Sequence, residues 1–213
     1  FTQPAGQAHA EVMALNAAGD ATGATAYVTL EPCSHQGQTG PCASALTDAG
    51  VARVVVAVED PNPQVAGRGI AALRAAGIEA ELGEGAEQVE ADLAGFLMRM
   101  RRGYGRITLK IAMSLDGRTA MPSGESQWIT GEDARADVQR LRAESDLMVT
   151  GVGTVLADDC RLTLRADELP FDADAKGRAL AHPPARMVLD SKGRTPAGAR
   201  ILEGGQTTVI TTE

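Results

Sequence analysis

The sequence has no run that approaches the ~18 consecutive apolar residues of a membrane span. Its opening residues, FTQPAGQAHAEV, lack the basic and apolar stretches of a signal peptide. These two absences predict a cytoplasmic protein with no membrane partner. Extreme composition is absent as well, since 44% of the residues are hydrophobic and 23% are charged, which excludes collagen-like and largely disordered chains.

Cysteine and positive charge are both scarce. The chain has only three cysteines, an odd number without a secretory signal, which argues against a disulfide framework and favours metal binding. It has 20 Lys and Arg against 28 Asp and Glu, for a net charge of −8. Because nucleic-acid affinity comes largely from cations that neutralise phosphates, this balance disfavours a nucleic-acid partner and favours a small substrate.

The first half of the chain alternates between short helical and strand patterns. Gly and Pro residues separate predicted helices at 9–19, 42–50, 69–77 and 87–103 from predicted strands at 24–30, 52–58 and 78–82. Such alternation favours an α/β layered fold with a largely parallel sheet, because each crossover is covered by a helix. No internal repeat is visible.

A second α/β unit is predicted downstream of the basic end of the helix at 87–103. Apolar patterns predict strands at 106–114, 147–151, 185–190 and 207–212, with a helix at 133–145. The stretch 166–184 is rich in Ala, Asp and Pro without periodicity and is interpreted as a loop or insertion. The predicted domains are therefore residues 1–103 and 104–213.

Three potential metal ligands occur at the predicted ends of elements. His9 and Glu11 open the first helix, Cys33 follows the first strand, and Cys42 begins the next helix. One imidazole and two thiolates leave a fourth position for water, which is typical of catalytic rather than structural zinc. Zinc lowers the pKa of its bound water, and Glu11 is the candidate that takes and returns the proton. Because residues i and i+2 point about 200° apart on a regular helix, His9 must lie at the helix terminus to share this site.

The same residues leave other interpretations open: a closed zinc knuckle with His35 as the fourth ligand, a Cys33–Cys42 disulfide, or three unrelated side chains. His-Ala-Glu together with Pro-Cys and a second Cys at a helix start matches the zinc deaminase signature. The eight residues between the cysteines are unusual, since most such deaminases have two.

Two sets of segments carry a resemblance to a known family. EPCSHQGQTGPC, followed by AGVARVVVAVEDPNPQVAGRGIAALRAAGI, resembles the deaminase half of the bifunctional riboflavin-biosynthesis deaminase/reductase family. TLKIAMSLDGRTAMPSGESQWITG, ARADVQRLRAESDLMVTGVGTVLADD and LTLR resemble the start of its reductase half. The resemblance implies a cytidine-deaminase-like α/β/α layered domain followed by a dihydrofolate-reductase-like α/β domain.

The family implies two successive reactions. The first is the zinc-dependent hydrolysis of the 2-amino group of 2,5-diamino-6-(5-phosphoribosylamino)pyrimidin-4-one. The second is the NADPH-dependent reduction of the ribosyl group of the product. Zinc and NADPH are thus the implied cofactors, a phosphoribosylaminopyrimidine is the implied small-molecule substrate, and a homo-oligomer is the implied assembly.

The resemblance also assigns individual residues. The zinc ligands are His9, Cys33 and Cys42, and the proton shuttle is Glu11. The deaminase substrate positions are His35, Asp60 and Asn62. The NADP positions are Ala112, Trp128, Thr154, Asp158 and Ser191. The reductase substrate positions are Ser126, Arg142, Leu162 and Arg165, with Lys110 and Asp158 expected to act in the reduction.

The chain departs from the family pattern in several places. Thr2 replaces a usual histidine, Gln38 a usual Lys or Arg, and Gly40 and Cys160 usual prolines. The first two changes are expected to weaken substrate anchoring without removing the zinc chemistry. Family members begin with further elements before His-Ala-Glu and continue past TTVITTE, so both domains are expected to be truncated here.

Two other functional hypotheses belong to different classes. One is a zinc deaminase of another base or nucleoside, with a C-terminal half that serves only in assembly. The other is a non-catalytic module stabilised by zinc, for which removal of Glu11 would change nothing.

Overall fold

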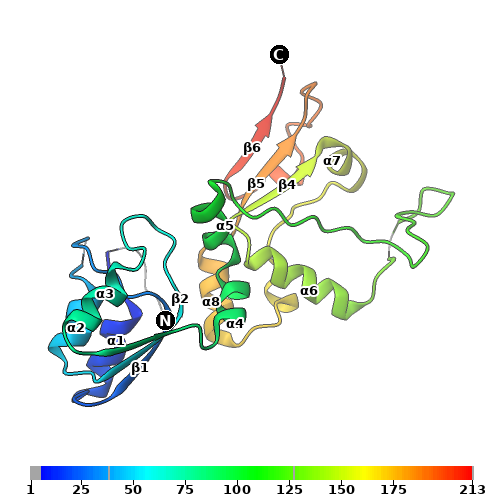
Figure 1. The fold of residues 1–213 in the computed structure, drawn as a ribbon. Coiled ribbons are helices and arrows are strands. Elements are labelled where there is room, and N and C mark those ends of the chain that lie inside the picture. The colour runs from blue at the N-terminus through cyan, green and yellow to red at the C-terminus, as the bar shows by residue number, and fades with distance from the viewer. Residues whose placement is uncertain (1–5, 38, 127, 213) are drawn as a thin grey trace. The chain divides into compact units, whose positions relative to one another are not determined.

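The structure is a computed structural model that describes residues 6–37, 39–126 and 128–212 (Figure 1). The chain divides into two compact units, Phe1–Leu109 and Lys110–Glu213. Among the described residues, each unit contains one sheet of three parallel strands in the order of the sequence. The predicted α/β class with parallel sheets is therefore confirmed.

The first unit alternates helices and strands as the sequence predicts. Its elements are α1 (Ala10–Ala18), β1 (Thr25–Leu30), α2 (Cys42–Asp48), β2 (Arg53–Val58), α3 (Arg68–Ala75), β3 (Glu79–Leu82), α4 (Ala86–Asp92) and α5 (Ala94–Arg102). Strand β2 is central, with five of its six residues buried. Its continuous run of Val and Ala is typical of a parallel strand covered on both faces.

The core of this unit lies on both sides of β2. Val54 and Val56 belong to one apolar cluster with Leu46 of α2 and Leu73 of α3. Ala57 belongs to a second cluster with Val89 of α4 and Leu97 of α5. The sheet is thus packed between helices on its two faces, which produces the three-layer arrangement that the sequence predicts.

The second unit is built around β4, β5 and β6. Its elements are α6 (Glu132–Ala143), β4 (Leu147–Gly151), α7 (Val152–Asp158), the 3₁₀ turn η1 (Ala166–Glu168), α8 (Ala173–Ala181), β5 (Ala185–Leu189), the 3₁₀ turn η2 (Arg200–Leu202) and β6 (Thr207–Ile210). Val152 and Val155 of α7 pack with Val188 of β5 and with Ile201 of η2. This cluster fixes α7 directly after the carboxyl end of β4.

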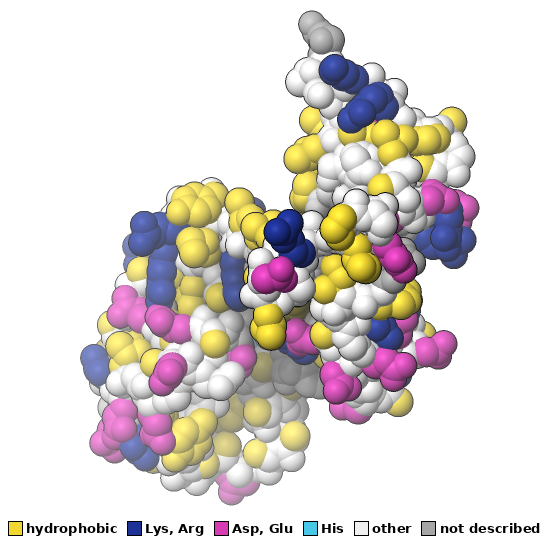
Figure 2. Space-filling model, turned by 90° about the vertical axis from the view of Figure 1, so that its right-hand side faces the viewer, with side chains coloured by type: hydrophobic (Ala, Val, Ile, Leu, Met, Phe, Trp, Pro, Cys, Tyr) yellow, Lys and Arg dark blue, Asp and Glu magenta, His cyan; other side chains and the backbone are white. Residues whose placement is uncertain are grey.

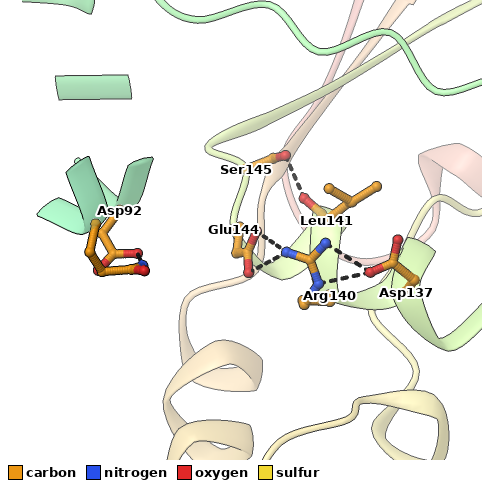
Figure 3. A network of polar contacts seen from close by, with 7 residues as sticks. Asp92, Asp137, Arg140, Leu141, Glu144 and Ser145 are labelled. Carbon is orange, nitrogen blue, oxygen red and sulfur yellow. Dashed lines mark hydrogen bonds and ion pairs between the residues drawn. The ribbon is translucent and has the colours of Figure 1, made fainter. Parts of the chain in front are cut away.

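Charged side chains cover the outer surface of α6. Arg140 lies between Asp137 and Glu144, with ion-pair distances of 2.8 Å to each (Figure 3). The spacings of three and four residues place these side chains on one face of the helix. Such exposed pairs stabilise a helix by only about 0.3–0.5 kcal/mol each, so the apolar contacts of the unit dominate its stability.

The prediction of one helix over residues 87–103 is wrong, because the structure contains α4 and α5 separated by Leu93. Leu93 has φ −97° and ψ 13°, outside regular helical geometry. It still accepts a hydrogen bond from the Leu97 amide at 2.9 Å. Leu93 packs against the cluster of Ala57, Val89 and Leu97. The helix is therefore interrupted at the residue whose side chain packs against the cluster that contains Ala57 of β2.

The prediction of a strand over residues 106–114 is also wrong. The segment is extended but has no neighbouring strand among the described residues, and Ile107 and Leu109 are 91% and 82% exposed. Apolar alternation indicates strand potential, but a strand exists only where another backbone accepts and donates its hydrogen bonds. Figure 2 shows hydrophobic side chains lying among charged ones on the surface that it draws.

The predicted loop at 166–184 contains two helical elements, η1 and α8. Asp172 caps α8, and its carboxylate accepts a hydrogen bond from the Ala175 amide at 2.8 Å. A capping Asp followed by ADAKGRALA provides a helix start and good helix formers. The Asp and Pro content of the whole stretch concealed this local signal. None of the described helices has the length and apolar character needed to cross a membrane.

Candidate functional site

His9, Cys33 and Cys42 converge in the first unit, although they come from three different elements. His9 is the residue that precedes α1, Cys33 lies three positions after β1, and Cys42 is the first residue of α2. The His9 Nδ1 atom is 3.2 Å from the Cys42 Sγ and 3.7 Å from the Cys33 Sγ. The three potential ligand atoms all lie within 4.8 Å of one another.

This donor set fits a zinc ion. Bonds of about 2.0 Å to nitrogen and about 2.3 Å to sulfur at a tetrahedral angle separate the two ligand atoms by about 3.5 Å. The distances from the imidazole nitrogen to the two sulfurs lie on either side of that value. All three cysteines are free, so the disulfide interpretation is wrong for this structure. Among the described residues, His35 is not a member of the ligand cluster, which removes the closed zinc knuckle.

The two cysteines have opposite electrostatic environments. A hydrogen bond with Cys42 lowers the pKa of Cys33 to about 5, and the imidazole of His9 acts in the same direction. The same hydrogen bond raises the pKa of Cys42, as do burial and the negative charge of Glu11. The Cys42 amide also donates to the Cys33 sulfur at 3.3 Å. Cys33 is therefore stabilised as the thiolate, the form that binds a metal.

Glu11 is close enough to act on this cluster. The charge of its carboxylate, together with a hydrogen-bonding interaction, contributes to the raised pKa of Cys42. His9 has extended backbone, with φ −67° and ψ 161°, and lies just before the first helical turn. The condition that His9 must lie at the helix terminus is thus met, and both side chains face one site.

A cavity of about 280 Å³ opens beside two of the three ligand candidates, His9 and Cys33. Its lining residues are Gly6, Gln7, His9, Cys33, His35, Gly37 and Thr39. The Nδ1 atom of His35 is buried and has no hydrogen-bond partner. A cavity that contains metal-ligand candidates and an unpartnered imidazole nitrogen is suited to a polar small molecule.

Asp60 and Asn62 lie in the loop after β2. Asp60 is only 8% exposed, and its Oδ1 accepts a hydrogen bond from the Asn62 amide at 2.8 Å. Burial raises the pKa of Asp60, and the nearby charge of Glu31 acts in the same direction, whereas the Asn62 amide and His35 lower it. Asp60 interacts electrostatically with His35, so the loop lies near this lining residue of the cavity.

In the second unit, Thr154 and Ser191 lie at the same edge of the sheet. Gly151 at the end of β4 pairs with Leu189 at the end of β5. Thr154 is in the first turn of α7 and Ser191 is two residues beyond β5. Ligands of open α/β sheets bind at the carboxyl ends of the strands, so this edge fits a nucleotide cofactor. Asp158 is exposed at the far end of α7.

Arg142 and Arg165 are electrostatic neighbours. Burial and the Arg165 cation lower the pKa of Arg142. The Arg142 Nη1 donates to the Thr163 carbonyl at 3.0 Å, while its buried Nε has no partner. Arg165 forms an ion pair with Glu168 at 2.6 Å. Leu162, between these segments, has a positive φ of 53°.

The remaining expected reductase residues lie on the irregular segment before α6. Lys110 and Ser126 are exposed, and Ala112 is half-buried. Trp128 is 68% exposed, and the Arg135 guanidinium lies 4.9 Å from the centre of its ring. Within the described ranges, this segment forms no strand pairing with the sheet that carries Thr154 and Ser191.

Among the described residues, four buried polar residues have no signal in the sequence patterns. They are Glu31 in the first unit and Gln139, Arg186 and Asp190 in the second. Glu31 follows the last residue of β1 and precedes the Pro-Cys motif of the metal site. No local sequence pattern shows that its carboxylate is buried. Gln139 accepts a hydrogen bond from the Arg165 amide at 3.1 Å. Arg186 donates hydrogen bonds to the carbonyls of Arg161, Glu203 and Gly204.

Two of the four departures from the family pattern are visible. Gly40 is exposed, and a Cβ atom added there would have no other atom within 4 Å. Cys160 is half-buried against the cluster of Val152 and Val188. Burial raises the pKa of Cys160, which agrees with an inert packed thiol. Thr2 and Gln38 lie outside the described residues.

Comparison with known proteins gives a family match in each half of the chain. Residues 2–58 match the cytidine and deoxycytidylate deaminase zinc-binding region, and residues 106–213 match the RibD C-terminal domain. The riboflavin biosynthesis protein RibD of Escherichia coli (strain K12) is 53% identical over 97% of this chain. The RibD of Haemophilus influenzae is 53% identical over 91%.

Solved structures agree with these sequence matches. Acinetobacter baumannii RibD is 51% identical over 97% of this chain with a TM-score of 0.85. A Thermotoga maritima protein titled diaminohydroxyphosphoribosylaminopyrimidine deaminase/5-amino-6-(5-phosphoribosylamino)uracil reductase is 34% identical over 98% with a TM-score of 0.84. The chain spans 57% of the length of the E. coli, A. baumannii and T. maritima proteins. The predicted order, a deaminase-type zinc-binding domain followed by a domain of the RibD C-terminal type, is confirmed.

Proposed function

Since this chain belongs to the RibD family of riboflavin biosynthesis proteins, we propose that it carries both a deaminase and a reductase that act successively on one pathway intermediate. The proposed substrate is 2,5-diamino-6-(5-phosphoribosylamino)pyrimidin-4-one. The proposed domains are residues 1–103 for deamination and 104–213 for reduction. The convergence of His9, Cys33 and Cys42 next to Glu11 is the observation that carries the proposal.

In the proposed deamination, His9, Cys33 and Cys42 hold the metal ion. Zinc bound by one nitrogen and two sulfurs supplies the Lewis acidity that activates water near neutral pH. Glu11 accepts the proton of the attacking water and later donates a proton to the leaving amine. Glu11 lies at the start of α1 near the three metal ligands but is not one of them. Its carboxylate is therefore free to exchange protons with water and substrate.

The cavity beside this centre is the proposed pyrimidine site. His35 lines it, and Asp60, in the loop that also contains Asn62, interacts electrostatically with His35. The unpartnered His35 Nδ1 and the buried Asp60 carboxylate provide directional polar groups for a ring with several N–H and C=O groups. These groups position the ring so that its amino-bearing carbon faces the metal.

For the reductase, the proposed NADPH site is the carboxyl edge of β4 and β5, with Thr154, Asp158 and Ser191. Ala112 and Trp128 are the further proposed cofactor contacts. NADPH supplies the hydride, while Ser126, Leu162, Lys110 and the two cations Arg142 and Arg165 orient the phosphosugar. The unpartnered Nε of Arg142 supports an anionic ligand at this position.

The proposed setting is the cytoplasm, where reducing conditions keep the cysteines available as metal ligands. A homo-oligomeric assembly, implied by the family resemblance, belongs to the same proposal. The charge balance of the chain disfavours a polyanionic partner and agrees with a small substrate.

Two separate assays test this function. The purified zinc-loaded chain is incubated with the diaminopyrimidine substrate, and ammonia release is measured. NADPH oxidation is then measured with the deaminated product as substrate. We expect both activities, and we expect removal of zinc to abolish ammonia release while NADPH oxidation continues.

Cytidine and deoxycytidylate are the control substrates. Deamination of either one, without action on the diaminopyrimidine, would support the alternative of a deaminase for another base. Absence of both activities in a zinc-loaded, folded chain would support a non-catalytic zinc module.

A further inference from the structure

Glu31 is a buried carboxylate at the end of β1, two residues before Cys33. It is only 3% exposed. Within the described part of the chain, no Lys, Arg or His forms an ion pair with it. A buried charge without a counter-ion requires hydrogen-bond donors to replace the lost water.

Backbone amides from two stretches of the chain supply those donors. The Oε1 atom of Glu31 accepts hydrogen bonds from Gly69 at 2.8 Å and Ile70 at 3.0 Å, in the first turn of α3. The Oε2 atom accepts from Gly67 at 2.9 Å and Asp60 at 3.3 Å. The carboxylate therefore caps the amino end of α3, where the amides lack helical partners, and also holds the start of the preceding loop.

The loop held in this way contains Asp60 and Asn62. Asp60 accepts from the Asn62 amide, and Asn62 accepts from the Gln64 amide at 3.1 Å. The Val65 amide closes the turn by donating to the Asn62 carbonyl at 2.8 Å. Glu31 is attached to both ends of this loop, at Asp60 and at Gly67, while the chain from Glu31 leads directly into Cys33.

We propose that Glu31 is a positioning residue that fixes the Asp60–Asn62 loop relative to the Cys33 metal centre. This inference rests on the proposed deaminase function, because it assigns substrate placement to a side chain that does not line the cavity. Because Glu31 is bonded to the loop and lies two residues before Cys33, it keeps the distance between Asp60 and Cys33 constant. A reaction between a substrate ring and a metal-activated water requires such a constant distance.

Glu31→Gln is the variant that tests the proposal. The amide keeps the shape of the side chain but presents an NH₂ group to backbone N–H donors, so part of the anchor is lost. We expect the KM of deamination to rise about tenfold or more, while kcat changes less and the zinc content stays at the wild-type value. Glu31→Asp, which keeps the charge, should recover part of the lost affinity.

Glu59→Gln is the matched control, since Glu59 is an exposed carboxylate in the same loop. It should leave the KM unchanged. The KM of the reductase reaction, which depends on the other unit, serves as a second control within each Glu31 variant.

Hydrogen exchange measured by mass spectrometry gives a readout that needs no activity. We expect faster exchange at residues 60–70 in Glu31→Gln, with β2 and α2 unchanged. Uniformly faster exchange across the first unit together with an unaltered KM would overturn the proposal, because Glu31 would then serve general stability alone. If the wild-type chain does not deaminate, the proposed function fails, and the exchange pattern still decides whether Glu31 anchors the loop. Glu31→Asp carries the same test if Glu31→Gln does not fold.

Discussion

His9 lies immediately before the first helical turn of α1, and this single backbone position determines which side chains meet at the metal centre. Its extended conformation turns the imidazole toward Cys33 and Cys42, whereas Glu11 is already helical. The two side chains then converge in spite of the divergence of about 200° between residues i and i+2 of a regular helix. The position of His9 just before the helix therefore allows it to bind the metal, while Glu11, two residues later, is available to transfer protons.

Glu11→Gln should abolish deamination without loss of zinc. Glutamine cannot transfer the proton, and removal of a general acid/base lowers a rate by about 10²–10⁴. Zinc content, ammonia release and NADPH oxidation are measured on the same preparation, and NADPH oxidation of the deaminated product should persist.

The matched control is Glu87→Gln, an exposed carboxylate in the first turn of α4. It should deaminate at the wild-type rate. Retention of deamination in Glu11→Gln would contradict the role given to Glu11 and favour a zinc module without catalysis.

At the level of elements, the backbone of α3 at Gly69 lies so close to the loop before Cys33 that a residue with a side chain would not fit there. A Cβ atom added at Gly69 would lie 1.9 Å from the carbonyl oxygen of Pro32. Both residues meet there through their backbones, so neither can turn away as a flexible side chain would. The absence of a side chain at Gly69 is therefore what allows the carboxylate of Glu31 to reach the amides of α3.

Gly69→Ala should lower the free energy of unfolding of the first unit by about 1–3 kcal/mol, because the backbone must shift to accept the methyl group. Denaturant unfolding followed by circular dichroism measures this change. Gly95→Ala in α5 is the control, since no atom lies within 4 Å of its added Cβ. That variant should stabilise the unit by about 0.5–1 kcal/mol, and equal effects of both variants would refute the close contact.

In the second unit, the buried side chain of Arg186 in β5 bonds to two loops, one at Arg161 and one at 203–204. Its guanidinium donates to the carbonyls of Arg161 and Glu203 at 3.1 Å each, and also to Gly204. Arg161 and Glu203 form an exposed ion pair at 3.0 Å over the same two loops. The buried arginine therefore satisfies carbonyl groups beside Leu162, whose positive φ needs support from its surroundings.

Arg186→Met should destabilise the second unit by about 1–3 kcal/mol, because it removes the donor that three part-buried hydrogen bonds share. Arg186→Lys should recover part of this loss, since an ammonium group cannot reach all three carbonyls in one plane. Arg161→Met removes only the exposed ion pair and should change the stability by less than about 1 kcal/mol. Thermal unfolding of the three variants ranks them, and an equal loss for Arg161→Met and Arg186→Met would contradict the assignment.

On the scale of the whole molecule, each unit has its own sheet, and none of the described apolar clusters is shared between the units. The cluster around Val54, Val56 and Leu73 lies wholly in the first unit, and that around Val152, Val188 and Ile201 wholly in the second. The three metal-ligand candidates all belong to the first unit. Stabilisation by zinc should therefore be confined to one part of the chain.

Removal of zinc by a chelator should lower the melting temperature of the first unit alone. A ligand that binds only the folded state stabilises it by about 2.7 kcal/mol when its free concentration is about 100 times its Kd, and chelation removes that contribution. Hydrogen exchange resolved along the chain measures the effect. Faster exchange in α1 and α2 with no change in β4 and β5 is expected, and restoration by added zinc is the control. Equal acceleration in both units would show that they do not unfold separately.

The sequence by itself determined the α/β class, the parallel arrangement of the strands, and the convergence of His9, Cys33 and Cys42. These features are encoded locally, because periodicity, helix starts and motif spacing depend on neighbouring residues. The roles of the individual reductase residues stay predictions.

Only the tertiary structure decided the break at Leu93, the unpaired segment at 106–114, and the inward carboxylate of Glu31. Each depends on backbone far away in the sequence: Leu93 packs on β2, and Glu31 accepts hydrogen bonds from amides 29 to 39 residues downstream. A strand pattern shows that a segment can pair, but the partner must be present in space. A buried charge likewise has no local signature, because its cost and its compensation arise only when distant amides fold around it.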